Sequence, residues 1–303
     1  MAFDGITVAA LVQELRDNLT GGRIAKIAQP EPDELLLTIK TPTGQRKLYI
    51  SASASLPLIY LTDENKLSPM TAPNFCMLLR KHIGNGKIIS ITQPGLERAV
   101  EFEIEHLDEM GDLCRKRLIV ELMGKHSNII FCTSEGMIID SIKHISAQVS
   151  SVREVLPGRE YFIPQTARKL NPLETGDEEM AAVMAQAPEP VGKALYSHFT
   201  GISPVMAEEF CHLASIESSV PAAELSEAER IHLSRTFSLA MESVKGGQFS
   251  PCILYKGEEP VEFSALAFTA LPADCCLKAF SSMSQVLETY YACLLYTSDA
   301  ADE

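Results

Sequence analysis

Basic side chains occur in short clusters along the first half of the sequence, and such clusters can hold phosphate groups. Four of them stand out: Arg80-Lys81-His82, Arg115-Lys116-Arg117, Lys125-His126 and Lys143-His144. Local clusters of positive charge, rather than the charge of a whole chain, decide whether a surface attracts a polyanion. We therefore treat the clusters as candidate nucleic-acid contacts. For any single cluster, a solvated surface face is the simpler interpretation.

The net charge of −14 argues against a nucleic-acid partner until the acidic residues are located. Residues 1–170 contain 20 Lys and Arg against 20 Asp and Glu, whereas residues 171–303 contain 6 against 20. The first part is therefore neutral overall with clustered cations, and the second part carries the whole negative charge. This difference predicts two modules with different surface chemistry.

The sequence contains no pattern typical of an enzyme or of a metal site. Phosphate-binding glycine loops, dinucleotide fingerprints and hydrolase or metalloprotease motifs are absent, and the seven histidines lack metal-ligand spacing. The eight cysteines form no CxxC pair and mostly lie in apolar runs, which favours buried, reduced thiols over disulfides or zinc. Glu101, Glu103 and Glu105 alternate and so share one strand face, most simply a solvated one. We predict no catalysis, cofactor or metal.

Membrane insertion and export are not expected. No apolar run reaches the roughly 18 residues that a membrane span needs. The first residues carry Asp4 and Glu14 without a basic segment, and they resemble an amphipathic helix rather than a signal peptide. We therefore predict a cytoplasmic protein without a membrane partner.

Residue spacing predicts an α+β domain over residues 1–170. Apolar residues at helical spacing fill 6–19 before Gly21-Gly22, and residues 73–82 have the same character. Short alternating or β-branched runs predict strands at 23–29, 34–40, 47–51, 87–93, 99–106, 117–123, 127–132 and 137–145. Because tight turns separate most of these runs, the sheet is expected to be mostly antiparallel.

After a linker at 169–177, the pattern becomes helical. Helices are predicted at 178–187, 191–199, 203–214 and 226–246, followed by strands at 250–255 and 261–268 and a helix at 279–291. Ser203 is a suitable N-cap with Pro204 at the first helical position. The segment could be a helix-hairpin-helix, whose turn amides meet a phosphate, or a plain helical hairpin, and spacing favours the plain hairpin.

The last eleven residues, Cys293–Glu303, require a separate interpretation. Their sequence, CLLYTSDAADE, can be back-translated into a string that resembles a transposase adapter used in sequencing libraries. We expect adapter read-through here and exclude the segment from the fold prediction. The alternative is a genuine polar C-terminus.

Several strings, in order, resemble the RqcH family of bacterial ribosome quality-control proteins, also labelled fibronectin-binding protein A. They are MAFDGI at 1–6, FCMLLRKHIGNGKI at 75–88, QPGLER at 93–98, ELMGKHSNII with IIDSIKH at 121–144, and LPGREY at 156–161. Two more are ALYSHFTGISPVMAEEF at 194–210 and FSSMSQVLETYY at 280–291. The resemblance covers residues 1–292.

The resemblance implies an NFACT-N domain at 1–170, a helix-hairpin-helix module at 178–246, and a 250–292 segment that leads to a coiled coil absent from this sequence. Family members bind the large (50S) ribosomal subunit that carries a stranded peptidyl-tRNA. They recruit alanyl-tRNA and promote C-terminal alanine tailing without mRNA. The implied partners are therefore this subunit with its rRNA, and tRNA.

The family's Asp-Arg pair for tRNA handling matches Glu97-Arg98, with the carboxylate one methylene further out. Arg98 could fork onto a phosphate or stack on a base, and Glu97 could orient it or accept from a 2′-OH. An exposed ion pair is the alternative. With this context, the predicted RNA contacts are Glu97, Arg98, Arg80, Lys81, His82, Lys125, His126, Lys143 and His144.

The resemblance raises two other possible functions. The implied architecture is similar to that of formamidopyrimidine-DNA glycosylases, but those need an N-terminal proline followed by glutamate, and this chain starts Met1-Ala2-Phe3-Asp4. The family's second label suggests a fibronectin-binding surface adhesin. An adhesin should carry an export signal or an anchor, and we find neither in these residues.

Overall fold

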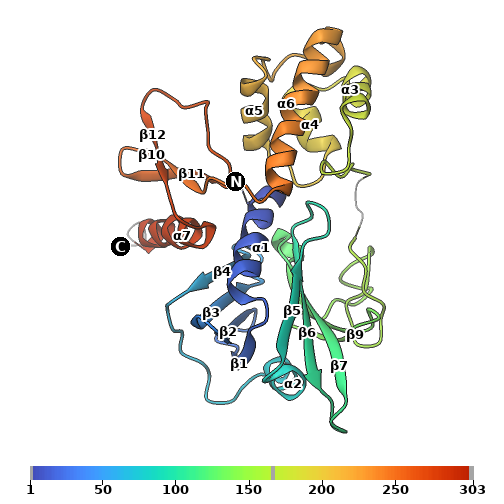
Figure 1. Cartoon of the computed structure of the whole chain (residues 1–303), viewed down its shortest axis with the longest axis vertical. Coiled ribbons are helices and arrows are strands. Elements are labelled where there is room, and N and C mark those ends of the chain that lie inside the picture. Colours follow the sequence, from blue (N-terminus) through green and yellow to red (C-terminus); the bar gives the residue numbers. More distant parts are fainter. Residues whose placement is uncertain (1–2, 165–167, 300–303) are drawn as a thin grey trace. The chain divides into compact units, whose positions relative to one another are not determined.

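The computed structural model describes residues 3–164 and 168–299. They form two compact units. The sheet unit contains residues 11–94 and 98–164, and the helical unit contains residues 3–10, 95–97 and 168–299. The fold is α+β with mostly antiparallel sheet, as the sequence predicts (Figure 1). The predicted boundary at residue 170 stays a prediction, because the contacts also assign two short early segments to the helical unit.

The sheet unit is built around nine antiparallel strands. They are β1 Arg23–Ala28, β2 Glu34–Thr41, β3 Gly44–Ser51, β4 Leu58–Thr62, β5 Lys87–Thr92, β6 Ala99–Leu107, β7 Leu113–Glu121, β8 Asn128–Thr133 and β9 Ile138–Ser141. Their order in the sheet is β4-β3-β2-β1-β5-β6-β7-β8-β9. Helix α1 spans Gly5–Leu19, α2 spans Asn74–Ile83, and a 3-10 turn covers Gly124–His126.

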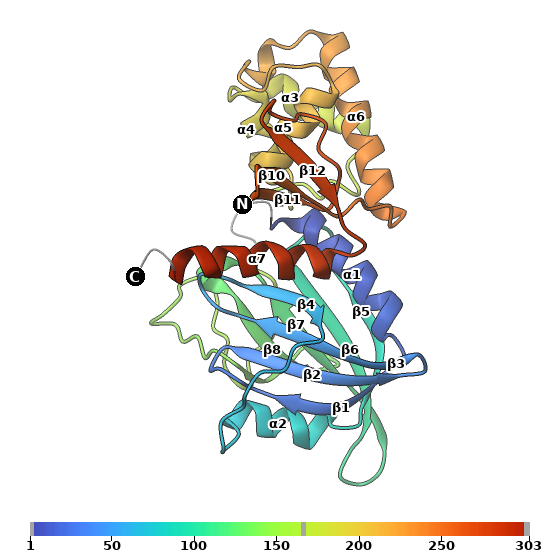
Figure 2. The ribbon, with the colours of Figure 1, turned by 90° about the vertical axis from the view of Figure 1, so that its left-hand side faces the viewer.

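The sheet bends where β1 meets β5. These two strands pair at one position only, Arg23 with Lys87, whereas the neighbouring strand pairs run along most of their length. The divergence lets β1–β4 fold over β5–β8 as two layers, with α2 beside β1 (Figure 2). The buried face of α2, formed by Phe75, Leu79 and Ile83, packs where the strands separate.

Strand alternation decides which side chains enter the core. Along β6, Phe102 and Ile104 are buried, and the intervening glutamates are half-buried on the opposite face. Part of that opposite face is covered by residues 142–164 through a small apolar cluster that includes Ile119, Cys132 and Val155. The covering segment thus converts an outer sheet surface into a second, smaller core.

The helical unit contains five helices, α3 to α7, and a small three-stranded sheet. Its elements are α3 Asp177–Gln186, α4 Val191–His198, α5 Pro204–Leu213, a 3-10 turn Ala222–Glu224, α6 Glu227–Lys245, β10 Cys252–Lys256, β11 Glu259–Ser264, β12 Cys275–Ala279 and α7 Met283–Asp299. The Phe199 and Phe210 rings lie 5.1 and 5.4 Å from the Phe237 ring on α6 and form the centre of the helical packing. Helix α6 begins with a capping box at Ser226.

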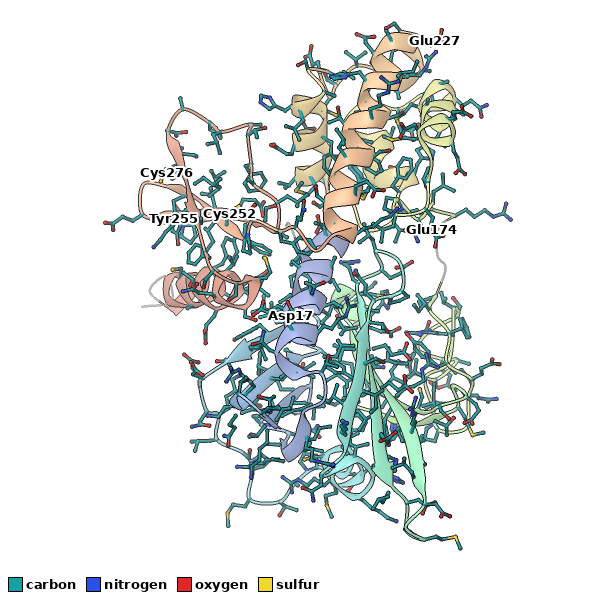
Figure 3. The ribbon with its side chains drawn as sticks, viewed as in Figure 1. Asp17, Glu174, Glu227, Cys252, Tyr255 and Cys276 are labelled. Atoms are coloured by element: carbon teal, nitrogen blue, oxygen red, sulfur yellow. The ribbon has the colours of Figure 1, made fainter. Side chains whose placement is uncertain are left out.

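Two strands were not predicted, β4 and β12. Both are five-residue strands that pair at sheet edges, and their sequences lack clear alternation. Four of the eight cysteines are buried as predicted, among them Cys252 on β10, whereas three are partly exposed and Cys276 on β12 is exposed (Figure 3). In the described part of the chain, no helix combines the length and apolarity needed to cross a bilayer. Residues 300–303 of the predicted adapter segment lie outside the described residues.

Candidate nucleic-acid interface

Arg98 directly precedes β6, and a backbone hydrogen bond fixes its surroundings. Its carbonyl accepts the Leu122 N–H at 2.8 Å, which ties the start of β6 to the turn after β7. That turn is the 3-10 segment at Gly124, whose φ of 57° favours glycine. The side chains of Arg98, Lys125 and His126 are exposed. No hydrogen bond or ion pair connects these three side chains to the other described residues.

Lys143 and His144 are held beside the same turn. The Asn128 side chain, which follows the turn, donates to the Lys143 carbonyl at 3.0 Å and accepts the Lys143 N–H at 3.1 Å. The two side chains are nevertheless engaged within the protein. The Lys143 ammonium donates to the Ala52 carbonyl, and burial lowers the pKa of Lys143. The His144 ring lies 2.6 Å from the Asp140 carboxylate.

Five predicted residues therefore gather at one end of the sheet, and we call them the Arg98 surface: Arg98, Lys125, His126, Lys143 and His144. The first three are available to a ligand, and the last two mainly hold the segment after β9 in place. Glu97, which precedes this surface in the chain, is half-buried.

The Arg80-Lys81-His82 cluster is not part of this surface, and its side chains separate. Arg80 Nε donates to the Ile27 carbonyl at 2.8 Å, and the Lys81 ammonium lies 2.9 Å from the Glu109 carboxylate. The His82 ring packs 5.7 Å from the Phe131 ring, and burial lowers the pKa of His82. Consecutive helical residues point about 100° apart, so sequence neighbours on α2 do not form one binding face.

The Arg115-Lys116-Arg117 cluster is divided by strand alternation. Arg115 pairs with Glu103 at 2.8 Å, and Arg117 pairs with Glu101 on β6. Lys116 points to the other face, where its ammonium is 3.3 Å from the His106 ring. The glutamates of β6 are thus half-buried ion-pair partners, and the prediction of a merely solvated face is wrong. Cross-strand neighbours on one face interact in this way.

The buried Glu121 carboxylate connects two of the strings that carry the family resemblance, the one at 121–144 and the one at 156–161. It accepts from Arg153 and, at 2.9 Å, from the Tyr161 hydroxyl. Burial raises the pKa of Tyr161 above its usual range. These bonds fasten the segment of residues 142–164 to the last residue of β7. A buried carboxylate needs such partners, because desolvation of an unpaired charge is costly.

Glu97 is positioned by a close crossing of three backbone segments within the helical unit. The Gly5 N–H donates to the Gly201 carbonyl at 3.0 Å, and Leu96 lies against both glycines. A Cβ atom added to Gly5 would be 2.0 Å from the Leu96 carbonyl oxygen, and one added to Gly201 would be 2.3 Å from it. Only glycine fits at these two positions, and φ at Gly201 is 79° as well.

Asp4 anchors the same crossing. Its buried carboxylate accepts the Thr7 N–H at 2.9 Å and the Ser203 hydroxyl at 2.7 Å. Ser203 also accepts the Met206 N–H, so the prediction that it caps α5 is confirmed. Burial raises the pKa of Asp4 to about 6. Sequence spacing did not identify Asp4 or the glycines as site residues, because their partners lie about 90 and 200 residues away.

A family model described as NFACT N-terminal and middle domains matches residues 4–297. The chain belongs to this family. The NFACT chain is 34% identical over 293 residues to the Bacillus subtilis protein named Rqc2 homolog RqcH, which covers 96% of this chain and 49% of that relative. It therefore spans about half the length of that curated relative.

Two further relatives extend the comparison. The solved N-terminal structure of the fibronectin/fibrinogen-binding protein from Streptococcus suis is 32% identical, with a TM-score of 0.79 over 96% of this NFACT chain and 99% of that one. The human protein named ribosome quality control complex subunit NEMF is 24% identical over 208 residues, which are 65% of this chain and 18% of that protein.

Proposed function

We propose that this NFACT chain is an RNA-binding part of a ribosome quality-control factor and that the Arg98 surface contacts tRNA. The observation that carries the proposal is the group of Arg98, Lys125 and His126. The three side chains are exposed, and they are attached to backbone segments that hydrogen bonds hold in place. None of the three has a hydrogen-bond or ion-pair partner among the described residues. Most other arginines of the sheet unit, in contrast, have a carboxylate or carbonyl partner.

The chemistry of the three side chains suits a nucleic acid. The Arg98 guanidinium can donate two parallel hydrogen bonds to a phosphate or stack on an unpaired base. Lys125 adds a point charge, and His126 can stack or donate. Glu97 can accept from a 2′-OH, a group that distinguishes RNA from DNA. One charge-assisted contact of this kind contributes about 1.5–3 kcal/mol.

For the whole protein, we propose the activity that the family resemblance implies. It binds the large (50S) subunit with its rRNA and stranded peptidyl-tRNA, and it recruits alanyl-tRNA for C-terminal alanine tailing without mRNA. The names of the bacterial and human relatives support ribosome quality control as the general setting. We further propose a cytoplasmic protein that acts by binding rather than by catalysis, because the interface contains cations but no paired acid, base and nucleophile.

We assign the α4–α5 hairpin, the predicted helix-hairpin-helix, a positioning role within a glycosylase-like arrangement. Its turn residue Gly201 accepts the Gly5 N–H, and its capping residue Ser203 donates to Asp4. These buried groups are used inside the helical unit, so they serve to hold Leu96 and the following Glu97 rather than to meet a phosphate.

Fibronectin binding is a second candidate, favoured by the name of the Streptococcus suis structure. A test between the candidates uses Arg98→Ala and a matched control, Arg235→Ala, which removes another exposed arginine, on α6. We expect Arg98→Ala to weaken tRNA binding by about tenfold or more, in line with one lost charge-assisted contact, and Arg235→Ala to have little effect. Wild-type protein that binds immobilised fibronectin but not tRNA would reject the proposal.

A further inference from the structure

We propose that a second surface of the sheet unit binds successive phosphates of an RNA backbone, and we call it the phosphate row: Arg23, Lys26, Lys40 and Lys87, with Arg80 at its edge. The proposal rests on the proposed function, since it takes RNA as the partner. It concerns residues remote from Arg98. Along β6, the position opposite Lys87 is seven residues from Arg98, which corresponds to about 23 Å.

Three of these cations form a line across neighbouring strands. Arg23 on β1 is directly opposite Lys40 on β2, and it is also directly opposite Lys87 on β5. Cross-strand partners project from the same face, and adjacent strands lie about 4.8 Å apart. All three side chains are exposed. The register therefore places three positive charges in a line about 10 Å long.

A β-bulge adds Lys26 to the same face. In a regular strand, residues 23 and 26 would point to opposite faces because side chains alternate. The β1–β2 register shifts between Ile24 and Lys26, and Lys26 then pairs with Thr38. The extra residue leaves both Ile24 and Ile27 buried while Lys26 is exposed near Arg23. Bulges commonly redirect a side chain in this way.

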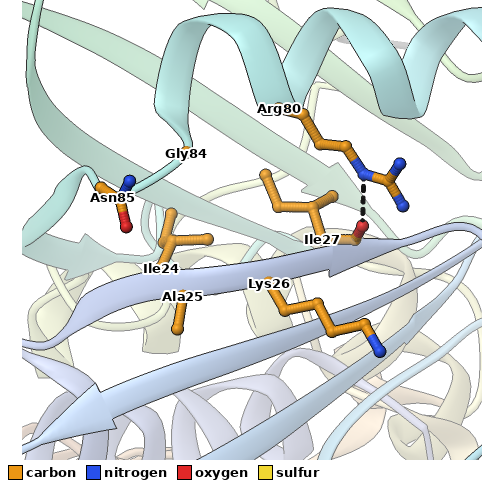
Figure 4. A pocket seen from close by; sticks show the side chains of 7 residues that line it. All are labelled: Ile24, Ala25, Lys26, Ile27, Arg80, Gly84 and Asn85. Carbon is orange, nitrogen blue, oxygen red and sulfur yellow. Dashed lines mark hydrogen bonds between the residues drawn. The ribbon is translucent and has the colours of Figure 1, made fainter.

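A shallow depression of about 330 Å³ lies between β1 and α2, beside the row. Its lining includes Lys26, Arg80 and Asn85 (Figure 4). Arg80 reaches from α2, and its Nε atom is held by the Ile27 carbonyl at 2.8 Å. The Arg23 guanidinium donates to the Asn85 carbonyl at 3.2 Å. Both guanidinium groups are therefore fixed by one bond each, and further N–H groups remain to meet a phosphate oxygen.

The absence of compensating acids separates this surface from an ordinary charged face. In the described part of the chain, no carboxylate lies within ion-pair distance of the five cations. Glu105 is opposite Lys87, but its carboxylate is 3.5 Å from Arg115. Like charges directly opposite each other destabilise a sheet. A chain with 40 acids and 26 Lys and Arg keeps this line unpaired, which indicates binding of an external anion.

The test compares Lys40→Gln/Lys87→Gln with Lys193→Gln/Lys278→Gln, which removes two exposed lysines of the helical unit. Binding of an alanine tRNA transcript is measured over a range of salt concentrations. Two lost phosphate contacts should lower the slope of log affinity against log salt by about 1.4 to 1.8. At moderate salt, we expect the tRNA affinity of the Lys40→Gln/Lys87→Gln variant to be weaker than that of wild type by roughly tenfold or more. The melting temperature should be equal or higher, because like-charge repulsion is removed.

Arg98→Ala, measured in parallel, separates the two proposals. If Arg98→Ala weakens tRNA binding while the Lys40/Lys87 variant keeps the wild-type affinity and salt slope, the phosphate row is rejected and the proposed function stands. If wild-type protein does not bind tRNA, the proposed function fails and the row fails with it. Loss of binding to phosphatidylglycerol vesicles in the row variant, with tRNA binding unchanged, would also overturn the row as an RNA site.

Discussion

Replacement of Gly5 by alanine tests whether the backbone crossing positions Glu97. The new Cβ atom would lie 2.0 Å from the Leu96 carbonyl oxygen and 2.7 Å from the Gly201 Cα atom. Both neighbours are backbone atoms, so no side-chain rotation can relieve the contact. Separation to van der Waals distance requires a shift of more than about 1 Å, and we expect a cost near 3 kcal/mol, the upper range for overpacking.

The shift should be visible in both stability and binding. A loss of about 3 kcal/mol corresponds to a fall in melting temperature of about 6–12 °C for a unit of this size. The displaced Leu96 should also move Glu97, so tRNA affinity should fall at temperatures where the variant is folded. Scanning calorimetry and a tRNA titration at 20 °C or below measure the two effects.

Gly176→Ala is the matched control for this experiment. Gly176 precedes α3, and no atom lies within 4 Å of an added Cβ. Gly176 is the N-cap of α3, so we expect the stability of the variant to stay within about 1 kcal/mol of wild type. A Gly5→Ala protein that melts within 1 °C of wild type and binds tRNA equally well would refute the close crossing and its role at Glu97.

Three further predictions concern the burial or exposure of single side chains. The pKa of Asp4 is raised from 3.8 to about 6, so its carboxylate destabilises the fold increasingly as pH rises from about 4 to about 6. The free energy of unfolding of Asp4→Asn, measured with urea and taken relative to that of wild type, should therefore rise by up to about 3 kcal/mol between pH 4 and pH 7. A difference between the two proteins that stays constant over this pH range would contradict the prediction. Glu121→Gln should cost about 3–5 kcal/mol by leaving the Arg153 charge buried, and a smaller loss in the same assay would show that water reaches the pair. Cys276 should react rapidly with a thiol reagent in folded protein, whereas the four buried cysteines should react only on unfolding; equal rates would contradict their burial.

The extent of agreement between sequence and structure depends on the range of the interaction. Helices α1 and α6 and most strands were predicted because their spacing reflects local burial, and Ser203 was identified as a cap because its signal lies within four residues. Strand β12 was missed because its five residues are mostly exposed and pair at an edge of the small sheet.

The candidate site was predicted in part for the same reason. Arg98 and Lys125 could be singled out individually, but their proximity depends on the pairing of β6 with β7. The grouping of Arg80, Lys81 and His82 as neighbours ignored the 100° step of a helix. The contact of Gly5 with Gly201 joins residues almost 200 positions apart, and a single sequence carries no local signal for it.

The most direct test of the central claim is a ribosome-pelleting assay with sequencing of the RNA that co-purifies, done with wild type, Arg98→Ala, Arg98→Lys and Glu97→Asp. We predict that wild type enriches large-subunit rRNA and tRNA and that Arg98→Ala loses tRNA without a large fall in melting temperature. Arg98→Lys should recover only part of it, because an ammonium cannot reproduce a planar fork, and Glu97→Asp should retain it. Wild-type levels of tRNA with Arg98→Ala, or no enrichment of rRNA and tRNA by wild type, would contradict the account.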